Sequence, residues 1–453
     1  MNLTTFHLTS LGCSKNKVDS DSMFQLLERN GYHMVDAPEK ASIIIVNTCG
    51  FINSAREESF SVLQSLAQNK KNHQLLIVAG CLTQRYGEEV ARRVLGVDGI
   101  LGTRRWMDIV DVIRRTRKNS VGSWTNGGGH KPFIHLPENI TIGVEENGTM
   151  RASIAGASAF LKIAEGCRRS CAFCSIPLIK GPAISRSMDA IIDDARHLQD
   201  GGIRELVLIA QDTSDYGHDF GLKDGLSHLL DKLSISVPDI DWIRIMYAFP
   251  GYVTDRLIDT ISTHQQVLPY LDIPLQHAAP NILKSMHRPS NIDWVRATIA
   301  KMRRNLPKLA IRTTFIVGYP GETEKDFQTL LDFVTEVRFD RVGTFQFSFE
   351  PGTISEQLGD PVPQLVKEDR YQRLMELQQS ISLQINQTYV GKSLDVLIEG
   401  KENGIAVGRS YRDAPEIDGL VFVEGKANIG DIVPIRVTGA MAYDLIGTPV
   451  NKY

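Results

Sequence analysis

Residues 43–51 read IIIVNTCGF, a run of four apolar residues, two polar residues and then a cysteine followed by glycine. The apolar run predicts a strand that is buried on both faces, as the strands of a parallel sheet are. Cys49 falls where this strand ends, and ligands bind at the carboxyl edge of such sheets. A lone cysteine here is more often a small buried residue. The other five cysteines decide whether it serves packing or chemistry.

Two further strands in the same region also end in cysteine, in HLTSLGC at 7–13 and LLIVAGC at 75–81. Carboxyl ends of parallel strands lie along one edge, so Cys13, Cys49 and Cys81 should converge although they are far apart in sequence. Each is next to a glycine. The coincidence favours three thiolate ligands of an iron–sulfur cluster with one open iron over three packing residues. The polar residues expected around this site are Asn16, Asn47 and Thr48.

The alternation of strands and helices predicts an α/β multidomain protein. Residues 1–118 should form an N-terminal parallel α/β sheet domain. A Gly- and Asn-rich stretch within 119–150 is expected to be a linker. Six strand–helix units in 151–375 predict a partial (β/α)6 TIM-like barrel, and short strands in 385–453 predict a small five-stranded antiparallel β-barrel. Thr323 and Asp326 form a possible capping box.

The remaining cysteines lie together in EGCRRSCAFC at 165–174, directly after the first predicted barrel strand. Cys167, Cys171 and Cys174 have the spacing C-x3-C-x2-C, which allows three thiolates to hold a [4Fe–4S] cluster and leave its fourth iron open to a small molecule. The alternatives are a zinc site or inert cysteines. Zinc normally takes four protein ligands, and the nearest further candidate, His197, lies in a predicted helix.

Composition and charge limit the possible partners. The net charge is −3 and the pI is about 6.4, so there is no overall basic footprint for nucleic acid. We expect neither an export signal nor a membrane span, and we interpret the Asn-x-Thr sequences at Asn139 and Asn147 as chance matches. The predicted location is the cytoplasm, where thiols stay reduced and clustered cysteines indicate metal.

The three-cysteine loop, with the aromatic Phe173 before its last cysteine, resembles that of the radical S-adenosylmethionine enzymes. SLGCSKNKVDSD at 10–21, VNTCGFINSAREES at 46–59 and VAGCLTQRY at 78–86 resemble the N-terminal domain of methylthiotransferases, and 385–453 resembles their TRAM domain. GRSYRDAPEIDGLVF at 408–422 is most similar to the RimO type, which modifies a ribosomal protein. Ser14 and Pro182 depart from the usual pattern of that type.

The resemblance implies two [4Fe–4S] clusters, one on each set of three cysteines, and S-adenosylmethionine. The implied reaction places a methylthio group on the β-carbon of an aspartate in the twelfth protein of the small ribosomal subunit. One S-adenosylmethionine donates the methyl group and another supplies the radical. The implied partners are an electron donor protein and a sulfur donor. We expect no membrane association and no stable binding of nucleic acid.

S-adenosylmethionine should lie over the carboxyl ends of the barrel strands. The candidate contacts besides Phe173 are Gln211, Asp212, Gln276, Arg312 and the backbone at Gly318. A plain turn explains the Gly-Tyr-Pro-Gly sequence at 318–321 equally well.

Three rival functions remain open from sequence alone. The first is the MiaB type of methylthiotransferase, which modifies adenosine in transfer RNA. The basic run RRTRK at 114–118 supports it, whereas seven basic and nine acidic residues from 385 onward favour a basic protein substrate. The second is a non-catalytic iron–sulfur carrier, and the third is a zinc-dependent RNA-binding protein.

Overall fold

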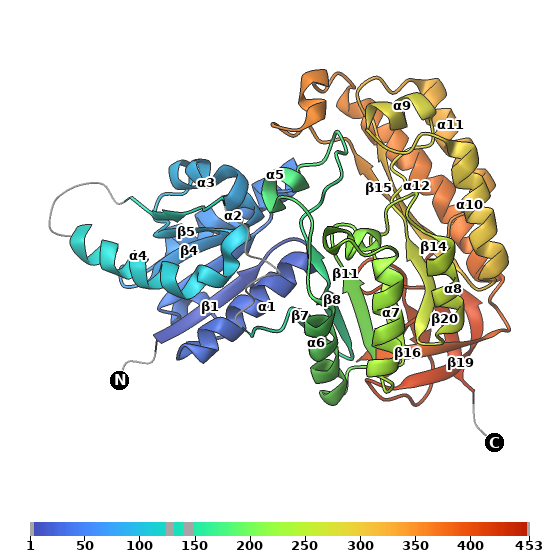
Figure 1. Ribbon diagram of the computed structural model, residues 1–453, viewed down its shortest axis with the longest axis horizontal. Coiled ribbons are helices and arrows are strands. Elements are labelled where there is room, and N and C mark those ends of the chain that lie inside the picture. The colour runs from blue at the N-terminus through green and yellow to red at the C-terminus, as the bar shows by residue number, and fades with distance from the viewer. Residues whose placement is uncertain (1–3, 124–130, 139–147, 451–453) are drawn as a thin grey trace. The chain divides into compact units, whose positions relative to one another are not determined.

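The computed structural model describes residues 4–123, 131–138 and 148–450 (Figure 1). The chain forms two compact units. Unit 1 comprises Met1–Ser153, Phe160–Ser187 and Ser348–Thr353, and unit 2 comprises Ile154–Ala159, Met188–Phe347 and Ile354–Tyr453. All six cysteines belong to unit 1. The predicted domain boundaries stay predictions, since these units combine parts of more than one predicted domain.

Unit 1 contains a six-stranded parallel sheet in the order β2-β1-β3-β4-β5-β6, which confirms the predicted N-terminal fold. Its strands are β1 Thr4–Ser10, β2 Tyr32–Met34, β3 Ile43–Thr48, β4 Leu75–Gly80, β5 Gly99–Gly102 and β6 Phe133–His135. Its helices are α1 Ser14–Arg29, α2 Asn53–Asn69, α3 Cys81–Arg93, α4 Ile109–Ser123 and α5 Ile176–Lys180. The predicted linker therefore includes β6. Residues 124–130 and 139–147, with Asn139 and Asn147, lie outside the described residues.

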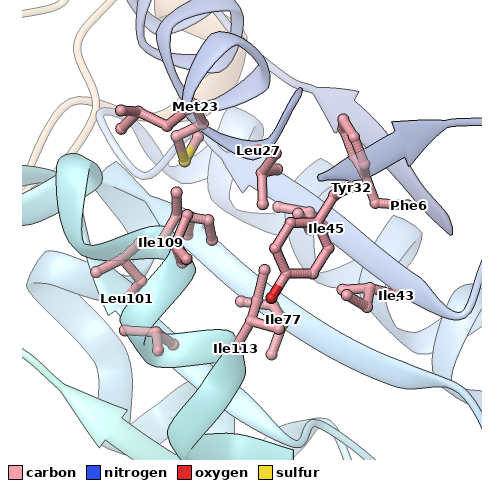
Figure 2. Close-up of a cluster of buried hydrophobic side chains, with 14 of the residues drawn as sticks. Phe6, Met23, Leu27, Tyr32, Ile43, Ile45, Ile77, Leu101, Ile109 and Ile113 are labelled. Atoms are coloured by element: carbon pink, nitrogen blue, oxygen red, sulfur yellow. The ribbon is translucent and has the colours of Figure 1, made fainter. Parts of the chain in front are cut away.

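Both faces of this sheet are buried, as the continuous apolar strands predict. Ile43, Ile45 and Ile77 face one core, where they pack with residues of α1 and α4 (Figure 2). Ile44 and Val46 alternate with them and enter the second core. Apolar cores on both faces hold the strands in register, so the strand ends that carry cysteine have defined positions.

Unit 2 is built on a seven-stranded sheet in the order β15-β14-β13-β12-β11-β8-β7, in which β7 and β8 also contain residues of unit 1. The strands are β7 Ala152–Ala155, β8 Ser158–Lys162, β11 Glu205–Ile209, β12 Trp242–Ile245, β13 Val267–Asp272, β14 Ala310–Val317 and β15 Arg341–Gln346. The helices are α6 Met188–Asp200, α7 Gly225–Ser236, α8 Asp255–Thr263, α9 Pro280–Ser285, α10 Ile292–Asn305, α11 Glu324–Val337 and α12 Gln364–Gln387. The six predicted barrel strands are present, and β7 is an additional strand.

The capping box at α11 is confirmed. The Thr323 hydroxyl accepts from the backbone N–H of Asp326 at 3.2 Å, and the Asp326 carboxylate accepts from the backbone N–H of Thr323 at 3.0 Å. These bonds satisfy two polar groups at the helix start and define where the preceding turn ends.

The C-terminal strands close into the five-stranded barrel expected from sequence, in the order β16-β17-β18-β20-β19. They are β16 Ser393–Glu402, β17 Ile405–Ser410, β18 Val421–Val423, β19 Ile432–Ala440 and β20 Leu445–Pro449. One pairing, β18 with β20, is parallel, while the others are antiparallel. A closed ring with an odd number of strands cannot alternate direction throughout, so closure itself requires a parallel pair.

Buried ion pairs bind this barrel to the rest of unit 2. Arg409 lies 2.6 Å from Glu205 at the start of β11, and Asp413 lies 2.5 Å from Arg341 at the start of β15. Arg412 lies 3.2 Å from Asp340. The segment 408–422, which resembles the RimO type in sequence, therefore has a structural role. Within the described part of the chain, no helix is long and apolar enough to span a membrane.

Candidate active site

The strand-end cysteines, Cys13, Cys49 and Cys81, follow the three adjacent strands β1, β3 and β4. Glycine lets these strand ends approach closely. A Cβ on Gly12 would lie 2.8 Å from the Cβ and 3.1 Å from the Sγ of Cys49, and one on Gly50 would lie 3.2 Å from the backbone carbon of Cys81. The structure thus brings the three together, and it explains the glycine beside two of them.

Exposure of the strand-end cysteines decreases from Cys13, which is exposed, through Cys49 to Cys81, which is buried. Burial raises the pKa of the Cys81 thiol to about 12, and the neighbouring Lys180 ammonium acts against this increase. Burial also raises the pKa of Cys49. A metal ligand must be a thiolate, so positive charge near Cys81 favours binding.

Polar residues near the strand-end cysteines hold the backbone in place. The Asn16 side chain donates to the carbonyl oxygen of Leu11 at 2.6 Å, and that of Asn47 donates to the carbonyl oxygen of Asn16 at 2.9 Å. The Thr48 hydroxyl donates to Ala79 at 2.6 Å. These contacts fix the ends of β3 and β4 and the start of α1.

The loop cysteines, Cys167, Cys171 and Cys174, lie between β9 Ala164–Glu165 and the short helix α5. The backbone N–H of Cys174 donates to Cys171 at 3.1 Å, which closes a turn, and the N–H of Cys167 donates to Gly181 at 3.0 Å. Gly166 has φ +74°, and a Cβ there would lie 1.9 Å from the carbonyl oxygen of Pro182. Only glycine fits this position. All three loop cysteines are partly exposed, which leaves this loop accessible to a small molecule.

The two cysteine sets fit iron–sulfur clusters in number and chemistry. No three His, Cys, Asp or Glu side chains among the described residues form a group that could hold a single metal ion. Each thiolate of a [4Fe–4S] cluster binds a different iron, so its ligands need not converge on one point as zinc ligands do. The loop cysteines place three partly exposed thiols on one short loop, where each thiolate could bind a different iron of one cluster.

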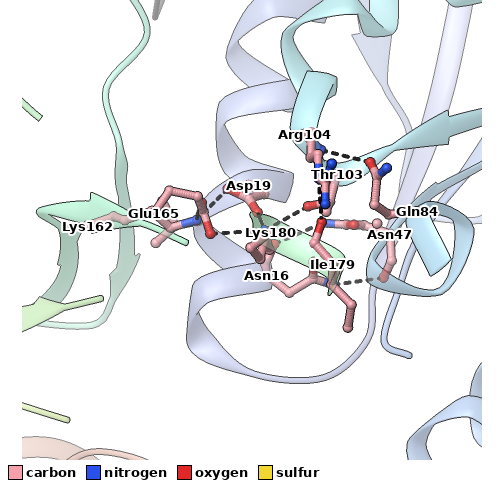
Figure 3. Close-up of polar contacts among 12 residues, drawn as sticks. Asn16, Asp19, Asn47, Gln84, Thr103, Arg104, Lys162, Glu165, Ile179 and Lys180 are labelled. Atoms are coloured by element: carbon pink, nitrogen blue, oxygen red, sulfur yellow. Dashed lines mark hydrogen bonds and ion pairs between the residues drawn. The ribbon is translucent and has the colours of Figure 1, made fainter. Parts of the chain in front are cut away.

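Five buried charged residues of unit 1, which no sequence pattern singles out, are joined by ion pairs. We call Asp19, Arg151, Lys162, Glu165 and Lys180 the charge cluster; their side chains are at most 3% exposed. Figure 3 shows Lys180 between Asp19, Glu165 and Thr103. The only sequence signal is proximity to cysteines, because Asp19 follows Cys13 by six residues and Lys180 follows Cys174 by six.

The predicted S-adenosylmethionine contacts other than Phe173 belong to unit 2. Gln211 and Asp212 follow β11, and Gly318 directly follows β14. Gln276 follows β13 with φ +77°, a conformation unusual for a non-glycine residue and frequent at binding sites. These four residues lie at carboxyl ends of strands, as the prediction requires.

Arg312 differs from the other candidates. It is the third residue of β14, its Nη1 lies 3.0 Å from Asp272, and its Nε lies 3.4 Å from Asp418 of the C-terminal barrel. Two carboxylates therefore bind its guanidinium, so Arg312 has a structural role. Its predicted contact with S-adenosylmethionine stays a prediction.

Family models match most of the chain. Residues 161–334 match the Radical SAM superfamily, residues 390–450 the TRAM domain, and residues 5–102 the Uncharacterized protein family UPF0004. A structure of the radical S-adenosylmethionine methyltransferase TsrM from Kitasatospora setae is similar in fold, with a TM-score of 0.56 at 11% identity over 88% of this chain and 79% of that one. The fold and the three-cysteine loop thus define a radical S-adenosylmethionine enzyme.

Relatives that match along the whole chain narrow this class. The ribosomal protein uS12 methylthiotransferase RimO of Roseiflexus sp. (strain RS-1) is 44% identical over 98% of this chain and 97% of its own length. The protein of the same name from Chloroflexus aurantiacus is also 44% identical, over 98% of this chain and all of its own. The chain belongs to the RimO family of methylthiotransferases.

Proposed function

We propose that this enzyme places a methylthio group on the β-carbon of an aspartate in ribosomal protein uS12. The relatives that match the whole chain carry this substrate in their names. The observation that carries the proposal is the convergence of the strand-end cysteines at one sheet edge of unit 1, because sulfur insertion needs a site beyond the one that generates the radical. One cluster alone would not explain these three cysteines.

In this proposal the loop cysteines hold one [4Fe–4S] cluster and the strand-end cysteines hold the second. When bound, the first cluster and S-adenosylmethionine supply one-electron chemistry that removes a hydrogen atom from an unactivated carbon. The β-carbon beside an ionised carboxylate has no useful acidity near neutral pH, so a base would not suffice. A second S-adenosylmethionine is the methyl donor.

The residues of this chain position and protect these groups. The Gly166 turn and the Cys167–Gly181 hydrogen bond shape the loop, and partial exposure leaves it accessible to S-adenosylmethionine. The proposed contacts in unit 2 are Gln211, Asp212, Gln276, Arg312 and Gly318, with Phe173 beside the loop cysteines. An electron donor protein and a sulfur donor complete the reaction, which we place in the cytoplasm with the ribosomal substrate.

Charge supports a protein substrate over transfer RNA. The C-terminal barrel region has a net charge of −2, which suits a basic ribosomal protein and not a phosphate backbone. The basic run at 114–118 lies on α4, where Arg115 pairs with Asp111 at 2.8 Å and both side chains are more than half exposed. Such a pair is typical of a solvated helix surface.

The decisive experiment compares the two substrates in parallel. The full chain is purified anaerobically, reconstituted with iron and sulfide, and given S-adenosylmethionine and a reductant with uS12 or with transfer RNA. We expect one methylthio increment in the mass of the uS12 aspartate peptide and none in RNA. An increment in RNA alone would assign the MiaB-type function. If cluster-loaded protein forms no 5′-deoxyadenosine at all, the carrier function replaces the enzyme.

A further inference from the structure

Lys180 is the member of the charge cluster that touches the most parts of unit 1. Its Nζ lies 2.9 Å from Asp19 on α1, 3.2 Å from Glu165 on β9 and 2.7 Å from the Thr103 hydroxyl after β5 (Figure 3). Its own helix, α5, begins two residues after Cys174. One ammonium group therefore joins the helix that follows Cys13 to both ends of the loop that carries the other cysteine set.

Neighbouring contacts hold α5 in the position that Lys180 requires. The Arg104 guanidinium donates to the carbonyl oxygens of Ile179 at 3.0 Å and Leu178 at 2.8 Å, and so binds the last carbonyl groups of this short helix. The Ser175 hydroxyl donates to the carbonyl oxygen of Phe51, two residues after Cys49, at 3.0 Å. The two cysteine sets are thus linked at several points.

Burying an ammonium group is costly unless nearby negative charge stabilises it. Within the charge cluster, three cations share two carboxylates, and Lys162 also binds both carboxylates at 2.6 and 2.7 Å. The five side chains therefore carry a net charge of +1 inside unit 1.

We propose that Lys180 is a positioning residue for the strand-end site: its ammonium holds α1, which follows Cys13, against the loop after β5 and both ends of the cysteine loop, and adds positive charge to this region. This inference rests on the proposed function, because it takes the strand-end cysteines to bind the second cluster. Residues that contact the metal ligands, but do not themselves bind the metal, affect both the affinity for the metal and its reduction potential. Reduction adds negative charge to a cluster, so a nearby cation favours the reduced form.

The test uses the full chain with Cys167, Cys171 and Cys174 changed to Ala, so that any cluster sits on the strand-end cysteines. Lys180→Gln removes the charge but keeps hydrogen-bonding capacity, and Lys180→Arg restores the charge. The matched control is Lys70→Gln, because Lys70 forms a comparable buried pair of unit 1, 2.5 Å from Asp98 at the amino end of β5. Circular dichroism verifies that each chain is folded.

Two readouts are compared, neither of which is enzyme activity. We expect Lys180→Gln to lower the midpoint potential of the cluster, which is measured by electron paramagnetic resonance during a redox titration. We also expect this variant to lose iron to a chelator about tenfold faster than the parent chain. Lys180→Arg and Lys70→Gln should stay within about twofold of the parent chain. The inference is overturned if Lys180→Gln matches the parent in both readouts, or if Lys180→Arg is as impaired as Lys180→Gln.

Failure of the inference is distinguishable from failure of the proposed function. The chain with all six cysteines is assayed separately for methylthio transfer to uS12. If it modifies uS12 while Lys180→Gln leaves the strand-end cluster unchanged, the function stands and the role of Lys180 is wrong. If it does not modify uS12 but the Lys180 effects are seen, the positioning role stands and the substrate is wrong.

Discussion

At the residue scale, the two cysteine sets have different surroundings. The loop cysteines are all partly exposed, whereas the strand-end cysteines range from exposed Cys13 to buried Cys81. A site that must bind a free small molecule needs access, while buried ligands are protected from solvent and oxidants. The proposed radical-generating site therefore lies on the evenly exposed loop, and the proposed sulfur-carrying site includes the buried Cys81.

Single cysteine variants should separate the two roles. We expect Cys171→Ala to abolish both 5′-deoxyadenosine formation and methylthio transfer, because the loop cluster would lose a ligand. Cys81→Ala should abolish methylthio transfer but keep 5′-deoxyadenosine formation. Both products are measured by mass spectrometry on reconstituted protein. If Cys81→Ala transfers the methylthio group at the parent rate, the strand-end cysteines are not the sulfur site.

A second residue-scale prediction concerns Glu322, in the turn before α11. Burial raises the pKa of Glu322 to about 7, although Arg370 lies 3.2 Å away and acts in the opposite direction. A carboxyl group whose pKa is higher in the folded state than the ordinary 4.5 stabilises the fold below pH 4.5. That contribution is lost as the pH rises towards 7.

Glu322→Gln should therefore be more stable than the parent above pH 7, by up to about 3 kcal/mol, and equally stable below pH 4.5. Denaturant unfolding at a series of pH values measures this difference. Burial lowers the pKa of His277 to about 4, so this residue has the opposite effect on how stability changes with pH. Because His277 is present in both proteins, its effect cancels in the comparison. The control Glu324→Gln changes an exposed residue, and its stability should follow that of the parent at every pH. If the stability difference between Glu322→Gln and the parent does not change with pH, the prediction is contradicted.

At the element scale, the segment 408–420 joins the C-terminal barrel to the central sheet through buried charges. Arg409 lies 2.6 Å from both Glu205 and Glu399, and Arg244 lies 2.7 Å from Glu205. Burial raises the pKa of Glu205, but Arg409 and Arg244 outweigh it and hold the pKa at about 2. Glu205 therefore stabilises the fold above pH 4.5, and this stabilisation is lost as the pH falls towards 2.

Arg409→Gln should destabilise unit 2 by about 3 kcal/mol or more, because Glu205 stays buried and loses one of the two cations that pair with it. The free energy of unfolding near pH 7 measures the loss, and the loss should shrink as the solution is acidified below pH 4.5. The control is Arg436→Gln, an exposed residue of β19. Equal stability of the two variants would show that the ion pairs do not bind the barrel.

At the scale of the whole molecule, the functional groups are divided between the two units. Unit 1 contains both cysteine sets and the charge cluster, while unit 2 contains the proposed S-adenosylmethionine contacts other than Phe173, together with the C-terminal barrel. The C-terminal barrel has no cysteine and a net negative charge in its region of the chain. Its proposed task is therefore recognition, while the proposed chemistry takes place at the cysteines.

Reversing charge on the C-terminal barrel should weaken substrate binding without altering the chemistry. The double variant Glu402→Lys/Glu424→Lys changes two exposed residues and takes the net charge from −2 to about +2. We expect the KM for uS12 to rise about fivefold and 5′-deoxyadenosine formation to stay constant. Glu39→Lys/Glu88→Lys, on exposed residues of unit 1, is the control with the same change in total charge. An unchanged KM in the barrel variant would exclude this surface from recognition.

Much of this protein follows from its sequence alone. The fold class and the capping box at Thr323 are found in the structure, and Cys13, Cys49 and Cys81 follow three adjacent strands of one sheet. These features depend on local patterns: apolar runs predict buried strands, and parallel strands place their carboxyl ends along one edge. Spacing within the loop cysteines is likewise a local property.

Only the tertiary structure decided which buried charges meet. Asp19 and Lys180 are 161 residues apart in sequence, and Arg409 and Glu205 are 204 apart. No periodic pattern links such residues, since a charged side chain in a helix or strand is usually solvated. The ion pairs of Arg312 were not predicted for the same reason: Asp272 is the last residue of β13, and Asp418 lies between β17 and β18. Long-range ion pairs depend on how the chain packs, and packing sets their distances only once the elements are assembled.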